Sequence, residues 1–155
     1  MVQRTSLAIA AAQGLELPTL FTEQVPHKLG ATSPELLALA PSARVFAKES
    51  FSAFADESTR DAIAAYSPQR ILICGLETPV CIYQTTLDAL RAGYQVTLLS
   101  DALGARRSDD TRDCLATLRG RGAEILPVET VFYALLKNVQ HPFFKAYTQL
   151  VKAHG

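Results

Sequence analysis

Two side chains have the type and the position that nucleophilic chemistry requires. Cys81 lies three residues after Thr78, and Thr78-Pro79 is typical of a helix start, with threonine as the N-cap. The helix dipole and its unpaired N–H groups stabilise a thiolate, which lowers a thiol pKa from about 8.5 to roughly 3.5–7.5. Cys81 is therefore a candidate nucleophile. The alternative is a small buried apolar residue, as most free cysteines are.

Lys48 is the second candidate, because it directly follows the predicted strand 44–47. The carboxyl ends of parallel strands form the ligand-binding edge of an open α/β sheet, so we expect Lys48 to face the region of Cys81. An ammonium beside a thiol favours the thiolate and can position or shuttle protons. The alternative is a solvated surface lysine. Phe51 and Phe54 follow, and we expect an apolar wall there, with core packing as the alternative for at least one of them.

Strands and helices alternate along the chain, which predicts a doubly wound α/β fold: a three-layer sandwich with a mostly parallel sheet, similar to Rossmann-like folds. We expect residues 1–155 to form a single domain. The predicted strands are 17–22, 44–47, 71–74, 95–99 and 124–126. The predicted helices are 2–13, a short one from 34, 57–66, one from 78 to Gly93, 108–121, 131–139 and 142–152.

Composition restricts the class of protein. The 155 residues are 48% hydrophobic and 19% charged, typical of a soluble globular domain. Fifteen basic and fifteen acidic residues cancel, which argues against nucleic acid or an anionic membrane as a partner, and no apolar stretch is long enough to span a membrane. Three cysteines, an odd number, favour a reducing compartment, so we expect a cytoplasmic protein.

Several cofactor chemistries lack support. The histidines at 27, 141 and 154 are scattered without ligand spacing, so we expect no metal. No glycine-rich phosphate loop follows a strand, so no nucleotide cofactor is expected. There is no Cys-x-x-Cys, and Cys74 and Cys114 are predicted to be inert core residues.

Several segments, in the same order, resemble the isochorismatase-like cysteine hydrolases, and most closely the branch of isochorismatase domain-containing proteins. The segments that carry the resemblance are 22–30 (TEQVPHKLG), 47–52 (AKESFS), 75–81 (GLETPVC), 85–90 (TTLDAL), 93–96 (GYQV) and 141–145 (HPFFK). Together they cover nearly the whole chain.

The resemblance implies a reaction and a set of roles. Cys81 would be the nucleophile and Lys48 a member of an Asp-Lys-Cys triad. Backbone N–H groups of Glu77 and Cys81 would hold an oxyanion, the former exposed by a non-proline cis peptide after Leu76. Leu76, Gln24 and Phe51 would contact the substrate, with loop anchoring as the alternative for Gln24. The implied reaction is hydrolysis of a small amide or vinyl ether without a cofactor, by a protein that forms homo-oligomers.

The triad Asp is the point of departure from the resembled family. There it ends a buried N-terminal strand, whereas Met1–Gly14 here matches the helix after that strand and no Asp precedes Asp56. We therefore expect impaired hydrolysis, or a sheet closed by rearrangement or by a partner's segment. The only plausible substitute acids are Glu23, Glu77 and Asp101, and Asp101 is expected mainly to cap or order a loop. The alternatives are a non-catalytic binding or scaffolding subunit of a homo-oligomer and, more weakly, a redox cysteine protein.

Overall fold

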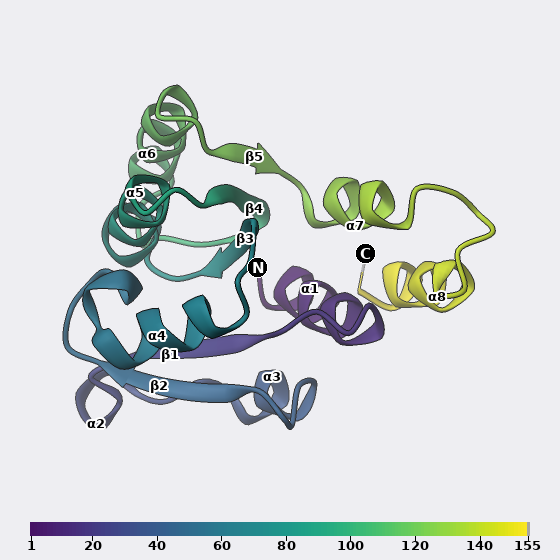
Figure 1. Ribbon diagram of the computed structural model, residues 1–155, viewed down its shortest axis with the longest axis horizontal. Coiled ribbons are helices and arrows are strands. Elements are labelled where there is room, and N and C mark those ends of the chain that lie inside the picture. The colour runs from purple at the N-terminus through teal and green to yellow at the C-terminus, as the bar shows by residue number, and fades with distance from the viewer. Residues whose placement is uncertain (155) are drawn as a thin grey trace.

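The computed structural model describes residues 1–154, in which strands and helices alternate as the sequence predicts (Figure 1). The strands are β1 (Leu20–Gln24), β2 (Arg44–Lys48), β3 (Arg70–Gly75), β4 (Gln95–Leu103) and β5 (Glu124–Leu126). The α-helices are α1 (Val2–Gly14), α2 (Pro26–Leu29), α3 (Pro34–Ala38), α4 (Glu57–Ala65), α5 (Tyr83–Arg91), α6 (Ser108–Gly120), α7 (Val128–Leu136) and α8 (Phe144–His154). A 3₁₀ turn, η1 (Ala53–Ala55), and a π-helical turn, η2 (Thr78–Ile82), complete the list.

All strand pairs are parallel, which confirms the predicted α/β class, but the strands form two sheets. One has the order β1-β2 and the other β3-β4-β5. No pairing joins β1 to β3 within residues 1–154, so each of these strands pairs on one side only (Figure 1). The residues described here therefore do not rearrange to close one continuous sheet.

Two apolar clusters lie on opposite faces of β4, where helices pack against the second sheet. Successive side chains of a strand point to opposite faces, so Leu98 and Leu99 enter different clusters. Leu98 packs with Val96, Leu118 and other residues on the α5 and α6 side. Leu99 packs with Leu7, Phe132, Tyr147 and others from α1, α7 and α8. None of the helices within residues 1–154 is both long enough and apolar enough to cross a bilayer.

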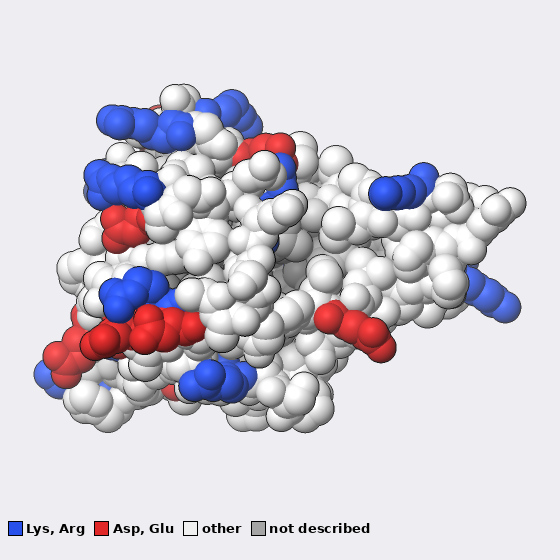
Figure 2. Space-filling view, viewed as in Figure 1, with Lys and Arg blue, Asp and Glu red and all other residues white. Residues whose placement is uncertain are grey.

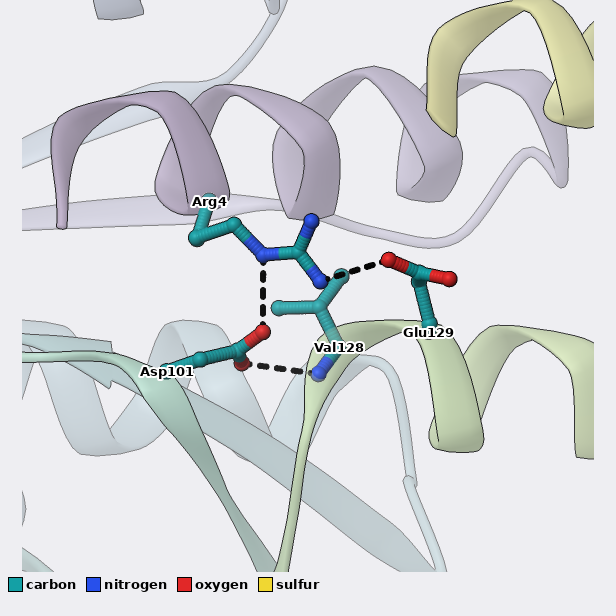
Figure 3. A network of polar contacts seen from close by, with 4 residues as sticks. All are labelled: Arg4, Asp101, Val128 and Glu129. Carbon is teal, nitrogen blue, oxygen red and sulfur yellow. Dashed lines mark hydrogen bonds and ion pairs between the residues drawn. The ribbon is translucent and has the colours of Figure 1, made fainter. Parts of the chain in front are cut away.

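A polar network ties α1, β4 and α7 together (Figure 3). Arg4 donates to Asp101 and to Glu129, at 2.8 Å in each case. Asp101 also accepts from the Val128 N–H at the start of α7, at 2.8 Å. The expectation that Asp101 caps or orders its surroundings is confirmed, although it lies within β4, which runs four residues beyond the predicted end.

Candidate active site

Cys81 lies in the π-helical turn that joins β3 to α5. Glu77 is the N-cap of this turn, and the Thr78 hydroxyl donates to the Gly104 carbonyl at 2.9 Å. The prediction of Thr78 as the N-cap is therefore wrong, because its side chain bonds to the end of β4 instead of the helix. Local π-helical turns are frequent at functional sites. This turn places a half-buried thiol at the carboxyl end of β3.

Lys48 is the last residue of β2, and only 4% of its surface is exposed. Its ammonium donates to the side-chain oxygen Oε1 of Gln24 at 2.6 Å. It also donates to the backbone carbonyls of Ser50 and Phe51, each at 2.9 Å. Three acceptors match the three N–H groups of an ammonium, so this buried cation is satisfied by neutral oxygens. The surface-lysine alternative is wrong for Lys48.

Gln24 brings the two candidates together. The Cys81 thiol points at the same Gln24 Oε1, with a sulfur–oxygen distance of 3.8 Å. Gln24 lies directly opposite Lys48 in the parallel pairing of β1 with β2. The amide nitrogen Nε2 of Gln24 donates to the Glu49 carbonyl at 2.7 Å. This bond orients the amide oxygen toward Lys48 and Cys81. The expected meeting of Lys48 with the region of Cys81 is thus found, with an amide oxygen between them.

Desolvation acts on two of the thiols, Cys74 and Cys114, and on the Lys48 ammonium. Desolvation raises the pKa of Cys74 to about 11. Desolvation also raises the pKa of Cys114, with smaller contributions from Asp110 and Asp113. Burial lowers the pKa of Lys48, while the nearby Cys81 and, more weakly, Asp56 oppose that shift. Both Cys74 and Cys114 are therefore held as neutral thiols.

Each acid that could replace a triad carboxylate is engaged elsewhere. Glu23 accepts from the Thr32 N–H at 2.7 Å, and Asp101 belongs to the Arg4 network. The Glu77 carboxylate lies toward Arg106, with a 3.3 Å bond from the Arg106 N–H. Within residues 1–154 no carboxylate oxygen lies within 4.0 Å of the Lys48 ammonium. The cluster thus contains a thiol, an ammonium and an amide, but no acid.

The peptide between Leu76 and Glu77 is cis, as the resemblance implied. None of the hydrogen bonds described for residues 1–154 uses the Glu77 N–H. The Leu76 side chain is 56% exposed and Phe51 is 52% exposed, whereas Phe54 is buried in the core. The core-packing alternative is therefore correct for Phe54. Leu76 and Phe51 are exposed and can contact a substrate.

No group of three or more His, Cys, Asp or Glu side chains within residues 1–154 is arranged to hold a metal ion. A pocket of about 190 Å³ adjoins Lys48, smaller than the roughly 300–1,000 Å³ usual for ligand sites. Its lining is Val25, Pro26, His27, Ala47, Lys48 and Glu49. Cys81 lies outside this lining, so the pocket borders the cluster from the Lys48 side.

Residues 1–130 match the isochorismatase domain. The chain belongs to the isochorismatase family. The secreted isochorismatase effector Isc1 of Phytophthora sojae is 36% identical over 99% of this chain and 75% of its own length. Isochorismatase domain-containing protein 2 of Xenopus laevis is 36% identical over 92% of this chain and 69% of its own. Members of the isochorismatase family are in general hydrolases. The Xenopus laevis relative bears the name of the branch that the sequence motifs indicate.

Solved structures share this isochorismatase-like fold. The MAR1 ribonuclease of Caenorhabditis elegans has a TM-score of 0.91 and 31% identity over 97% of this chain and 77% of its own. YcaC from Pseudomonas aeruginosa, solved with hexane-2,5-diol and covalent acrylamide, has a TM-score of 0.84 and 25% identity, covering 97% and 81% of the two chains. The Escherichia coli YcaC product, an octameric hydrolase of unknown specificity, shares the fold with a TM-score of 0.90 at 24% identity, covering 97% and 75%.

Proposed function

We propose that this isochorismatase-family chain, as one domain over residues 1–155, is a cysteine hydrolase of small amides or vinyl ethers. The observation that carries the proposal is the contact of both Lys48 and Cys81 with one oxygen atom, Gln24 Oε1. A buried ammonium beside a helix-start thiol is the arrangement that stabilises a thiolate nucleophile. The reaction needs no metal or organic cofactor, because the thiolate itself attacks the substrate.

For an amide, the Cys81 sulfur forms a bond to the carbonyl carbon, and the carbonyl oxygen becomes an oxyanion. The backbone N–H groups of Glu77 and Cys81 donate to that oxygen. The carbon–nitrogen bond then breaks, and the amine leaves with a proton from the Lys48 ammonium. Water hydrolyses the resulting thioester, which releases the carboxylic acid, returns one proton to the Lys48 amine and regenerates the Cys81 thiolate. Leu76 and Phe51 are the proposed apolar contacts, and the second N–H of the Gln24 amide is left for a polar group of the substrate.

The acrylamide bound covalently in the Pseudomonas aeruginosa YcaC structure gives independent support. Acrylamide is an electrophilic small amide to which thiolates add readily. A fold that holds such an adduct is compatible with a nucleophilic cysteine in a small-amide site.

Turnover by this chain is proposed to be slow. Among residues 1–154 no carboxylate pairs with Lys48 and the hydrogen-bond partner of Cys81 is an amide, so no carboxylate base takes the thiol proton or assists the attack of water. General acid–base catalysis typically contributes about 10²–10⁴-fold in rate. This observation also favours a second candidate, a non-catalytic binding or scaffolding subunit of a homo-oligomer.

A trapping experiment separates the two candidates. The chain is mixed with small amides and esters that carry good leaving groups, and intact mass after acid quenching is measured, with Cys81→Ser as the matched variant. The hydrolase predicts an acyl adduct that peptide mapping places on Cys81 and that Cys81→Ser loses. Absence of any adduct at Cys81 across amides, esters and acrylamide favours the binding subunit.

Compartment and assembly complete the proposal. Three unpaired cysteines fit the reducing cytoplasm, which is the proposed location. A homo-oligomer is proposed because apolar side chains on α7 and after it are exposed, among them Tyr133, Leu135 and Val139. The proposed ligand is a small molecule, with neither nucleic acid nor membrane as a partner.

A further inference from the structure

Gln24 stands between two sheets that no strand pairing joins among residues 1–154. Lys48 ends β2 in the two-stranded sheet, and Cys81 follows β3 in the three-stranded sheet. Gln24, at the end of β1, contacts both through one oxygen atom, at 2.6 Å from the Lys48 nitrogen and 3.8 Å from the Cys81 sulfur. One side-chain oxygen therefore contacts both the ammonium and the thiol.

We propose that Gln24 is a positioning residue that holds the Lys48 ammonium beside the Cys81 sulfur and so aligns nucleophile and cation across the two sheets. The inference rests on the proposed function. It assigns Gln24 a role in forming the nucleophile that is separate from contact with a substrate. Gln24 acts through Lys48, so removing Lys48 makes Gln24 irrelevant to the reactivity of Cys81.

The surroundings of Gln24 support a fixed orientation. The amide nitrogen donates to the Glu49 carbonyl at 2.7 Å, so a rotated amide would place a donor against the Lys48 ammonium. The other two acceptors of Lys48, the carbonyls of Ser50 and Phe51, lie on its own loop and give no link to β3. Among the described residues, Gln24 is thus the one hydrogen-bond acceptor of Lys48 that also contacts Cys81.

The charged groups that act on the cluster are few. Asp56, before α4, acts weakly on Lys48 and is itself bonded to Ser58 and Thr59. Glu23, beside Gln24, is bonded to the Thr32 N–H. Changes in the reactivity of Cys81 are therefore expected to follow Lys48 rather than these acids.

The test measures the rate of Cys81 alkylation by iodoacetamide from about pH 5 to pH 10, read by peptide mass. Four proteins form a double-mutant cycle: wild type, Gln24→Met, Lys48→Met and the double variant. Loss of a nearby opposite charge shifts a pKa by about one to three units. Lys48→Met is therefore expected to move the profile of alkylation rate against pH to higher pH. Gln24→Met is expected to shift it the same way and slow labelling at pH 7 about three- to tenfold, a part of the Lys48 effect. The double variant is expected to match Lys48→Met.

Two further variants serve as controls. Gln13→Met removes a glutamine of α1 whose side chain donates only to Thr19 at 3.0 Å, and its profile should match wild type. Gln24→Asn withdraws the amide oxygen by one methylene while keeping a polar side chain, and it should follow Gln24→Met. If Gln24→Met does not fold, Gln24→Asn takes its place in the cycle.

The outcomes separate the inference from the proposed function. A Gln24→Met profile equal to wild type, or an equal slowing with and without Lys48, overturns the positioning role while the Lys48 effect stands. A wild-type profile with the midpoint of an ordinary thiol, about 8.5, and no response to Lys48→Met overturns the proposed thiolate–ammonium pair itself.

Discussion

At the scale of the residue, Lys48 is a buried cation that pairs with no acid in the part of the chain that the structure describes. A buried ammonium held by neutral oxygens remains costly because desolvation disfavours its charged form. Burial lowers the pKa of Lys48 below its ordinary 10.5. A buried lysine therefore lowers the stability of the fold. Such a loss of stability is expected where a residue serves catalysis rather than folding.

The first prediction concerns stability and pH. Between the lowered folded pKa of Lys48 and 10.5, the unfolded chain binds the extra proton, so stability rises with pH across this window. We expect the free energy of unfolding of Cys81→Ser to rise relative to that of Cys81→Ser/Lys48→Met as pH approaches 10.5. Urea titrations measure the difference, and the Cys81→Ser background removes the titration of the thiol. Exposed Lys152→Met in the same background is the control, and a flat difference for Lys48→Met would contradict the prediction.

The second prediction concerns the three thiols. Cys74 has a pKa of about 11 and Cys114 a raised pKa, both through burial, whereas Cys81 lies at a helix start beside an ammonium. At pH 7 we expect iodoacetamide to label Cys81 at least about tenfold faster than the other two. Peptide mass mapping at short times gives the three rates. Faster labelling of Cys74 or Cys114 than of Cys81 would contradict the assignment of Cys81 as the nucleophile.

The candidate positions of Cys81 and Lys48 could be predicted because each follows a short apolar strand, and strand ends meet at one sheet edge. The role of Gln24 between them could not. The sequence suggested a strand over 17–22, but β1 runs from Leu20 to Gln24, since Pro18 lacks an N–H and the ladder starts after it. Only the resulting register places Gln24 opposite Lys48, and register depends on tertiary pairing.

At the scale of the element, apolar periodicity and Gly or Pro signals predicted most strands and helices. The short helix α2 was missed because four residues following a left-handed Val25 carry no periodic pattern. The start of α7 was placed three residues late, at Val131. Its true start, Val128, is set by the distant Asp101 carboxylate, which no local signal reveals.

The third prediction tests that cap. Asp101→Ala leaves the Val128 N–H without an acceptor and removes one of the two carboxylates that bind Arg4, so it should destabilise the protein by about 1–3 kcal/mol. Asp101→Asn keeps an oxygen for Val128 and should cost less. Urea unfolding gives both values. Asp61→Ala, at an exposed ion pair with Arg60, is the control and should be nearly neutral. Equal losses for Ala and Asn would mean that the ion pair, rather than the cap, dominates.

At the scale of the whole molecule, charge and apolar surface are unevenly distributed. Figure 2 shows few charged side chains over the region of α7 and α8 compared with the side of the strands. Val139, which follows α7, is 70% exposed, and Tyr133 and Leu135 on α7 are also exposed. Exposed apolar groups of this kind commonly form contacts between subunits.

The fourth prediction is therefore self-association through this surface. We expect sedimentation at micromolar concentration to give a mass above one chain, and Leu135→Lys/Val139→Lys to shift it toward the monomer, because two charges would be buried in the contact. Ala64→Lys/Gln69→Lys, which adds the same two positive charges at exposed positions in and after α4, controls for added charge. A monomeric wild type at this concentration would contradict the prediction.

The fifth prediction concerns the free edges of β1 and β3. Met1 packs beside Gly104 and Leu76 at the carboxyl end of the second sheet, so a segment fused ahead of Met1 could run between the two strands and end there. An extended apolar segment of five residues ending in Asp should raise stability by about 0.5–1.5 kcal/mol for each hydrogen bond gained. It should also raise turnover of a small amide by supplying a base.

A matched segment with two prolines, which cannot complete the ladder, is the control for that fusion. Replacing the final Asp by Asn isolates the effect of the base on turnover from the effect of pairing on stability. Urea midpoints and product release are the two measurements. Equal midpoints for the apolar segment and its proline version would show that the edges of β1 and β3 do not accept a strand.

Because Lys48 ends one sheet and Cys81 follows the other, the reactivity of a single sulfur reports the relative orientation of two structural units. Any ligand that binds with different affinity to two such orientations must change the thiol's ionisation, and ionisation of the thiol must change that ligand's affinity by the same factor. The site is thus thermodynamically linked to events that need not touch it, and remote binding would be visible as a shift in the chemistry of Cys81.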